Sequence, residues 1–185
     1  MAQYELNAPL SDEDARKLRS GDVVYLSGTI YTARDAAHKK LCDLLDAKEK
    51  LPLELEGAVI YYVGPSPAKP GNVIGAAGPT TSYRMDAFAP RLHSLGVKAS
   101  IGKGIRNEAV KQSLKDYGAV YFGATGGAGS LLGTCIKEAE VIAFPDMGPE
   151  ALRRLRVERL PLLVINDSVG GELYVQPDLK AVGLA

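Results

Sequence analysis

The stretch Ala58–Val63, Ala-Val-Ile-Tyr-Tyr-Val, decides the fold class, because it consists of the apolar, β-branched and aromatic residues that favour a buried strand. It ends at Gly64–Gly71, where three prolines prevent regular structure. Outward from this stretch, short apolar runs predict further strands at 23–26, 97–101, 119–122, 141–144 and 162–165. Helical spacing and start signals predict helices at 35–48, about 80–94 and about 107–115. Because strands alternate with helices, the sequence predicts an α/β domain with at least some parallel pairing.

Length and charge balance narrow the class of protein. The chain has 185 residues, which predicts a single domain over residues 1–185 with a core of its own. Lys plus Arg and Asp plus Glu both total 22, so no net field draws the chain to nucleic acid or to an anionic membrane. No apolar run approaches the roughly 20 residues of a membrane helix, and Met1–Asn7 has no secretory apolar region. We therefore expect a cytoplasmic protein with no nucleic-acid or membrane partner.

The two cysteines, Cys42 and Cys135, are far apart in the sequence and belong to no Cys-x-x-Cys or Cys/His cluster. This spacing argues against a zinc or iron–sulfur site that the chain could build alone. We expect two free, mostly buried thiols. The alternative is that one of them reaches a cofactor held by another chain.

The first candidate site is Ser27–His38. We expect a strand to end here and a turn of small residues to follow. A helix is then expected to begin with Arg34 at its N-terminus. Strand ends in α/β sheets commonly bind ligands, and the guanidinium of Arg34 is a fixed fork for a carboxylate or phosphate. The alternative is an ion pair between Arg34 and a nearby surface acid, and the pattern favours neither. His38 could orient a ligand or an acid, but a lone helical histidine is more often structural.

The second candidate site is Gly78–Asp86, which is dense in small residues before an expected helix. With Thr80 or Thr81 as N-cap, the free backbone amides of the first turn would form an anion site. Arg84 lies four residues after Thr80 and would share its helix face. A hydroxyl, amides and a guanidinium would then converge on a small carboxylate. The alternative is simple capping, with Arg84 solvated.

Glycine-flanked stretches provide weaker candidates. Lys103 stands between two glycines after an expected strand and could reach into a cleft, although a solvated lysine is the commoner outcome for such a turn. Gly123–Ser130 lacks both the G-x-G-x-x-G spacing and a Walker lysine. Close backbone packing, or a backbone wall beside a small ligand, is therefore favoured there over dinucleotide binding. His93 is expected to be structural.

Three segments in this order carry a specific resemblance to a known family, namely Gly28–His38, Gly78–Asp86 and Gly102–Gly104, and the segments Gly123–Leu132 and Ile165–Asp167 also fit it. They resemble the class I fumarate hydratase family, to which L-tartrate dehydratase is closely related. The resemblance is to the C-terminal catalytic domain of that family, which is a separate β subunit in many archaea and bacteria. It covers nearly the whole chain, roughly Leu10–Val175.

The resemblance implies a fold and a partner. The fold would be a swivelling β/β/α three-layer domain, with stacked sheets and flanking helices. The partner would be a larger, cysteine-bearing α subunit that binds a 4Fe-4S cluster through three cysteines and leaves one iron open as a Lewis acid. This chain, which lacks those cysteines, would be the β subunit of a hetero-oligomer, for which two α and two β chains are plausible from the family.

The resemblance also implies an activity and a set of site residues. The reaction would be reversible hydration of fumarate to L-malate, with L-tartrate dehydration as the alternative. Arg34, Arg84 and Lys103 match positions that contact the substrate, and Lys103 is a catalytic candidate as well. Thr80 matches the threonine proposed as base, although a free hydroxyl needs help from an acid, which the α subunit would supply; positioning a carboxylate is its alternative role. Outside this class, a non-catalytic dicarboxylate-binding module and a nucleotide-binding protein remain open.

Overall fold

The computed structural model describes residues 1–124 and 129–174, which form one mixed α/β arrangement. Seven strands are present in this part of the chain: β1 (Gln3–Ala8), β2 (Val23–Thr32), β3 (Val59–Tyr61), β4 (Ala99–Gly102), β5 (Val120–Gly123), β6 (Ile136–Ala143) and β7 (Leu152–Asn166). The helices are α1 (Asp12–Lys17), α2 (Asp35–Asp46), α3 (Ala89–His93), α4 (Glu108–Tyr117) and α5 (Gly129–Thr134). Two 3₁₀ helices complete the set, η1 (Ser82–Met85) and η3 (Pro145–Glu150).

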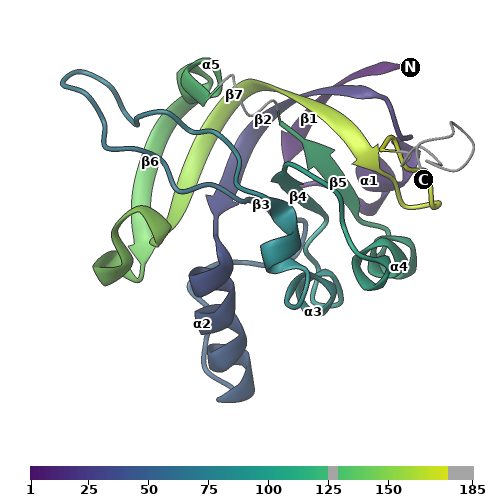
Figure 1. The fold of residues 1–185 in the computed structure, drawn as a ribbon, viewed down its shortest axis with the longest axis horizontal. Helices are drawn as coiled ribbons and strands as arrows, with labels where there is room; N and C mark the ends of the chain where they lie inside the picture. The colour runs from purple at the N-terminus through teal and green to yellow at the C-terminus, as the bar shows by residue number, and fades with distance from the viewer. Residues whose placement is uncertain (125–128, 175–185) are drawn as a thin grey trace, which may run out of the picture.

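The strands form one sheet in the order β1-β2-β3-β4-β5-β7-β6. Strands β1 to β5 are parallel to their neighbours, whereas β7 is antiparallel to β2, β5 and β6. Since β7 bonds to β2 through residues 153–163 and to β5 through residues 163–166, the pairing β2-β3-β4-β5-β7 closes on itself. Figure 1 shows β7 arching across the sheet, with α2, α3 and α4 on one side of it. The predicted α/β class with parallel pairing is confirmed.

Both faces of the inner parallel strands β3, β4 and β5 are buried, which explains the unbroken apolar run at 58–63. Tyr61 and Val63 pack into one core cluster together with residues of β2, β5 and β7. Their neighbours Ile60 and Tyr62 pack into a second cluster beneath α2, η1 and α3. A strand that alternates between two apolar clusters needs no polar face. Residues of β3 therefore contribute to two separate core clusters where this strand ends.

The ends of the helices follow ordinary capping chemistry. Helix α4 begins after Asn107, whose side-chain oxygen accepts a hydrogen bond from the amide of Val110 at 2.9 Å, and ends at Gly118 in the left-handed region. Helix α1 begins with a reciprocal capping box between Ser11 and Asp14. Helix α2 begins directly after Arg34, at the end of β2. The predicted helices at 35–48 and 107–115 are confirmed.

Two local predictions are wrong. The turn expected after residue 26 does not form, because β2 continues to Thr32 and pairs along this length with β7, with one irregularity between Leu26 and Gly28. The single helix expected over 80–94 is instead the short η1 followed by α3. Pro90 explains the break, because within a continuous helix its ring would collide with the preceding turn and remove a backbone hydrogen bond.

The strands predicted at 141–144 and 162–165 are parts of longer elements, β6 and β7. Strand β1 and helix α1 were not predicted. In β1, apolar and polar residues alternate, with only Leu6 and Ala8 fully buried. Such half-exposed edge strands lack the continuous apolar run that marked the inner ones.

Gly28 is required where β1 meets β2. Its φ is +101°, and a Cβ there would lie 2.3 Å from the carbonyl oxygen of Ala8. Gly71 is a matched control, because its φ is also positive, at +84°, while its Cβ would meet no described atom within 4 Å.

We therefore expect Gly28→Ala to lower the free energy of unfolding by more than about 3 kcal/mol, since backbone strain and a collision with backbone add together. Gly71→Ala should cost only about 1 kcal/mol, because only the strain remains. Urea unfolding followed by far-ultraviolet circular dichroism measures both. Equal losses in the two variants would contradict the close approach of β1 to Gly28.

Candidate active site at the carboxyl edge of the parallel strands

The carboxyl ends of β2, β3 and β4 meet at one edge of the sheet, since these strands are parallel neighbours. Strand β2 leads into Arg34, β3 leads into Tyr62 and Gly64, and β4 leads into Lys103. Ligands in α/β sheets commonly lie outside such carboxyl ends. The edge therefore gathers segments that are far apart in the sequence.

Arg34 and Arg84 are joined through acids. The Nη2 atom of Arg84 donates to a carboxylate oxygen of Asp35 at 2.8 Å, and the Nε atom of Arg34 lies 3.8 Å from the other oxygen. The Nη2 atom of Arg34 also lies 3.0 Å from Glu150. A Cβ on Gly64 would lie 3.1 Å from Nη1 of Arg34, so the end of β3 packs directly against this guanidinium. The structure thus confirms the ion pair weighed for Arg34 and brings both arginines together.

Thr80 and Lys103 are joined through backbone. The amide of Thr80 donates to the carbonyl of Tyr62 at 2.7 Å, and Thr81 forms a parallel bridge with Lys103. The amide of Ser82 donates to the carbonyl of Lys103 at 2.9 Å. Half-buried Thr80 and exposed Lys103 therefore lie on adjacent segments at this edge.

Of the two residues expected as the helix N-cap, Thr80 and Thr81, the structure places Thr81 at that position. The residue preceding η1 is Thr81, and its side chain makes no capping hydrogen bond. The amide of Thr80 is already used by Tyr62, and η1 is only four residues long, so no helix N-terminal anion site forms here. Nor do Thr80 and Arg84 share a helix face, because the helix begins after Thr80.

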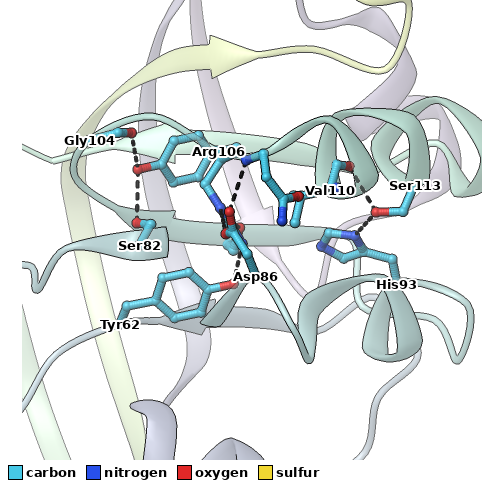
Figure 2. A network of polar contacts seen from close by, with 11 residues as sticks. Tyr62, Ser82, Asp86, His93, Gly104, Arg106, Val110 and Ser113 are labelled. Atoms are coloured by element: carbon cyan, nitrogen blue, oxygen red, sulfur yellow. Dashed lines mark hydrogen bonds and ion pairs between the residues drawn. The ribbon is translucent and has the colours of Figure 1, made fainter. Parts of the chain in front are cut away.

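A buried ion pair lies behind this edge (Figure 2). The Nε atom of Arg106 donates to Asp86 at 2.6 Å, and the two side chains are 0% and 7% exposed. The guanidinium also donates to Ser100 at 3.1 Å and lies 5.3 Å and 4.9 Å from the ring centroids of Tyr62 and Tyr121. Burial alone would lower the pKa of Arg106, but nearby Tyr62 and Asp86 outweigh it and raise that pKa above its ordinary value. The charge is thus retained in the interior.

A second set of contacts joins the ion pair to the edge. The other oxygen of Asp86 accepts from the amide of Asn107 at 2.8 Å. The hydroxyl of Tyr121 donates to the carbonyl of Gly104 at 2.9 Å and lies 2.9 Å from Oγ of Ser82. Because a carbonyl can only accept, Ser82 donates to Tyr121. The sequence did not point to Arg106 or Tyr121; the one available signal was an arginine two residues after the Gly-Lys-Gly turn.

Both histidines are structural. His38 is fully buried, its Nδ1 lies 2.9 Å from the carbonyl oxygen of Arg34, and its ring packs against Tyr62 and Phe88. Burial lowers the pKa of His38 to about 4. His93 lies 2.8 Å from Oγ of Ser113, and burial lowers its pKa to about 3, which agrees with the structural role expected for it.

The glycine-rich stretch 123–130 is only partly visible. Residues 125–128 lie outside the described part, so the backbone-wall interpretation of this stretch is not tested. At its end, the carbonyl of Gly129 accepts from the amide of Ala77 at 3.0 Å, and a Cβ on Gly129 would lie 3.0 Å from the amide nitrogen of Gly78. This end of the stretch packs closely against the segment that leads to Thr80.

Metal donors are sparse in the described residues. Cys42 is buried, Cys135 is half-buried, and both are free thiols. Within residues 1–124 and 129–174 no three His, Cys, Asp or Glu residues lie close enough to hold a metal ion. These residues therefore do not fit an iron–sulfur cluster. In the same two segments every helix is too short or too polar to cross a membrane.

The comparisons with known proteins agree with this architecture. The family described as Fumarase C-terminus matches residues 1–177. A protein of Methanocaldococcus jannaschii, provisionally named L(+)-tartrate dehydratase subunit beta, is 39% identical over 96% of this chain and 94% of its own length. The anaerobic class I fumarate hydratase of Escherichia coli is 37% identical over 82% of this chain but only 28% of its own length. A protein of Geobacillus stearothermophilus, provisionally named class I fumarate hydratase, is 39% identical over 91% of this chain and 33% of its own length.

The parallel strands of this α/β domain end at a cluster of charged side chains, at the kind of edge where ligands commonly bind in such folds. The matches make the assignment specific: the chain belongs to the fumarase C-terminal domain family. It spans a third or less of the two fumarate hydratases above and nearly all of the tartrate dehydratase β subunit.

The buried histidines predict an acid-sensitive fold. An unfolded chain titrates its histidines near pH 6.5, whereas the folded chain does so near 4 and 3. Between these values only the unfolded chain binds the protons, so the free energy of unfolding should fall as pH is lowered from about 6.5 toward 4. Each histidine contributes up to about 1.4 kcal/mol per pH unit within that window.

Urea unfolding at pH 7.5, 6 and 5 measures this slope. His93→Asn keeps a polar atom near Ser113 but does not titrate, so its slope should be about half that of the wild type. A wild-type stability that stays constant from pH 7.5 to pH 5 would contradict the neutral, buried state of both rings.

Proposed function

We propose that this chain is the β-type part of an iron–sulfur hydro-lyase that catalyses reversible hydration of fumarate to L-malate. The observation that carries the proposal is the gathering of Arg34, Thr80, Arg84 and Lys103 at one edge of the sheet, in a chain of the fumarase C-terminal family. All four are the positions to which the resemblance to the family gives substrate-binding or catalytic roles.

The cations at this edge suit a dicarboxylate. Each guanidinium carries five N–H donors, and contacts with Asp35 and Glu150 use only part of them. The Arg84 side chain is 41% exposed and that of Arg34 is 21% exposed, so both can be reached from solvent. Lys103 adds a third positive charge on the neighbouring segment. These groups would bind the two carboxylates and offset negative charge that develops when a proton next to one of them is removed.

Thr80 is the proposed proton acceptor of this chain. A free hydroxyl is a weak base, so the role requires an acid or base from another part of the complete enzyme. The alternative role is to hold a substrate carboxylate by a hydrogen bond. Lys103 is proposed to act beside Thr80, where its ammonium group would stabilise charge on the reacting carboxylate.

The partner is proposed to be a cysteine-bearing α subunit that binds the 4Fe-4S cluster. Two observations support this. The described residues of this chain do not supply a cluster site, and the chain matches a protein named as a β subunit along 94% of that protein's length. The chain spans only 33% and 28% of two fumarate hydratases that it matches, and the remaining part of those enzymes is proposed to correspond to such a partner. A hetero-oligomer follows from this arrangement.

The finer structural assignments are also proposals. A swivelling β/β/α domain over residues 1–185 is supported by the closed pairing through β7 and by helices α2, α3 and α4 on one side of the sheet. A cytoplasmic location is supported by two cysteines that remain free thiols.

L-tartrate dehydration is the second candidate activity. It is favoured by the relative that this chain matches along almost its full length, whose provisional name is that of a tartrate dehydratase β subunit. L-tartrate differs from L-malate by one hydroxyl group, and the cations at the edge would bind the carboxylates of either.

The test is an anaerobic assay that follows fumarate absorbance with this chain, its candidate α partner and a reconstituted cluster. Arg84→Ala should lower kcat/KM by about a hundredfold, because a charged hydrogen bond to a substrate carboxylate is lost. Arg91→Ala is the matched control, since Arg91 is 40% exposed and pairs with Asp46 at 2.7 Å, much as Arg84 pairs with Asp35. Its kcat/KM should stay within twofold of the wild type.

L-tartrate is assayed beside L-malate with the same mixture. Turnover of tartrate without malate would change the substrate and keep the class of reaction. If a mixture with an intact cluster turns over neither, the chain is better described as a non-catalytic dicarboxylate-binding module.

A further inference from the structure

The turn after β4 and the segment around η1 carry the two most exposed candidate cations, Lys103 and Arg84. The geometry points to a positioning device behind them: Tyr121, Ser82 and the Asp86–Arg106 pair fix the two segments relative to each other. The inference deepens the proposed function and rests on it for the role of Lys103 and Arg84.

The η1 segment is held on both sides of Arg84. On one side, Ser82 donates its amide to the carbonyl of Lys103 at 2.9 Å and its hydroxyl to Tyr121. On the other side, Asp86 accepts from Arg106 at 2.6 Å and from the amide of Asn107 at 2.8 Å. Arg84 therefore projects from a loop whose two ends are tied to the segment that carries Lys103.

The turn after β4 is held in the same way. Its Gly104 carbonyl accepts from the hydroxyl of Tyr121, which lies on β5. Gly102 packs so closely on Ser82 that a Cβ would overlap Oγ of that residue. Three of the contacts that join the two segments therefore pass through Ser82, and one hydroxyl group, that of Tyr121, touches both segments.

The device is rigid because its members are buried and satisfied. Burial raises the pKa of the Tyr121 hydroxyl above its ordinary value, so the group keeps its proton and donates it to Gly104. Arg106 lies between the rings of Tyr62 and Tyr121 and has no exposed side-chain surface. Side chains locked in this way hold the groups they support to within a fraction of an ångström.

Tyr121→Phe isolates the effect of the hydroxyl. The ring remains packed on Arg106, while the links to Ser82 and Gly104 are lost. A displacement of about 1 Å in a positioned group reduces rates by up to about a hundredfold. We expect KM for L-malate to rise at least about tenfold, because Lys103 and Arg84 no longer converge on the same dicarboxylate. A loss of folded protein alone would lower kcat and leave KM unchanged.

The assay uses the reconstituted complex, with Ser82→Ala, the double variant and a control. Ser82→Ala should raise KM similarly, and the double variant should be no worse than the more severe single variant, because both residues act through one contact. Ser113→Ala is the control: it removes another buried hydroxyl, one that contacts His93 and Val110 in the α3–α4 region. It should lower the melting temperature and leave KM within twofold of the wild type.

Amide hydrogen exchange on the full chain provides a readout independent of activity. The amides of Ser82 and Asn107 cross between the two segments. Their exchange should become at least about tenfold faster in Tyr121→Phe, whereas the amides of β2 should be unchanged.

A rise in KM together with faster exchange at Ser82 and Asn107 supports the inference. Wild-type KM in Tyr121→Phe overturns it, and so does unchanged exchange at these amides. If the wild-type complex shows no turnover, the proposed function fails, and the exchange data alone decide whether Tyr121 fixes the two segments.

Discussion

Burial of the Arg106 charge is the constraint on which the site depends. A guanidinium without exposed surface is tolerated only if a counter-charge, hydrogen bonds and polarisable neighbours replace water. Here those groups come from separate elements. Asp86 follows η1, and Ser100 lies on β4. Tyr62 follows β3, and Tyr121 lies on β5. The contacts that stabilise the buried charge of Arg106 therefore fix the relative positions of β3, β4, β5 and η1.

The sheet makes this convergence possible. Strands β2 to β5 are parallel, so their carboxyl ends lie at one edge of the sheet. Strand β7 pairs with both β2 and β5, so the hydrogen-bonded pairing of these strands forms a closed ring. A closed pairing leaves the inner strands no free edge along which to slip. The apolar clusters on both faces then fix the register, because a shift of one residue would exchange Tyr61 with its neighbours in the two clusters.

The sequence predicted the elements whose residues face apolar surroundings on both sides, such as 58–63, and the helices with clear caps. Strand β1 was not predicted, because this edge strand lacks a continuous apolar run. The predicted end of β2 came too early, because the apolar run of β2 is interrupted at Ser27 and Gly28. For the candidate site, the motifs around Arg34 and Lys103 pointed to segments that the parallel strands bring to one edge of the sheet. Helical spacing misled the prediction for Thr80, because its amide bonds to the carbonyl of Tyr62 and the short helix η1 begins only after Thr81. Arg106 could not be predicted, because its role arises from partners that only the tertiary fold brings together.

The two sides of this edge differ in a way that suits binding. Behind it, Asp86 and Arg106 are almost fully buried, and their energetic cost is met when the chain folds, not when a ligand arrives. In front of it, Arg84 contacts Asp35 in a partly exposed pair, which can rearrange at little cost because exposed pairs are weak. A dicarboxylate would then exchange weak contacts for stronger ones against a rigid background. Groups that are held in place before the reaction stabilise developing charge better than groups that must first become ordered.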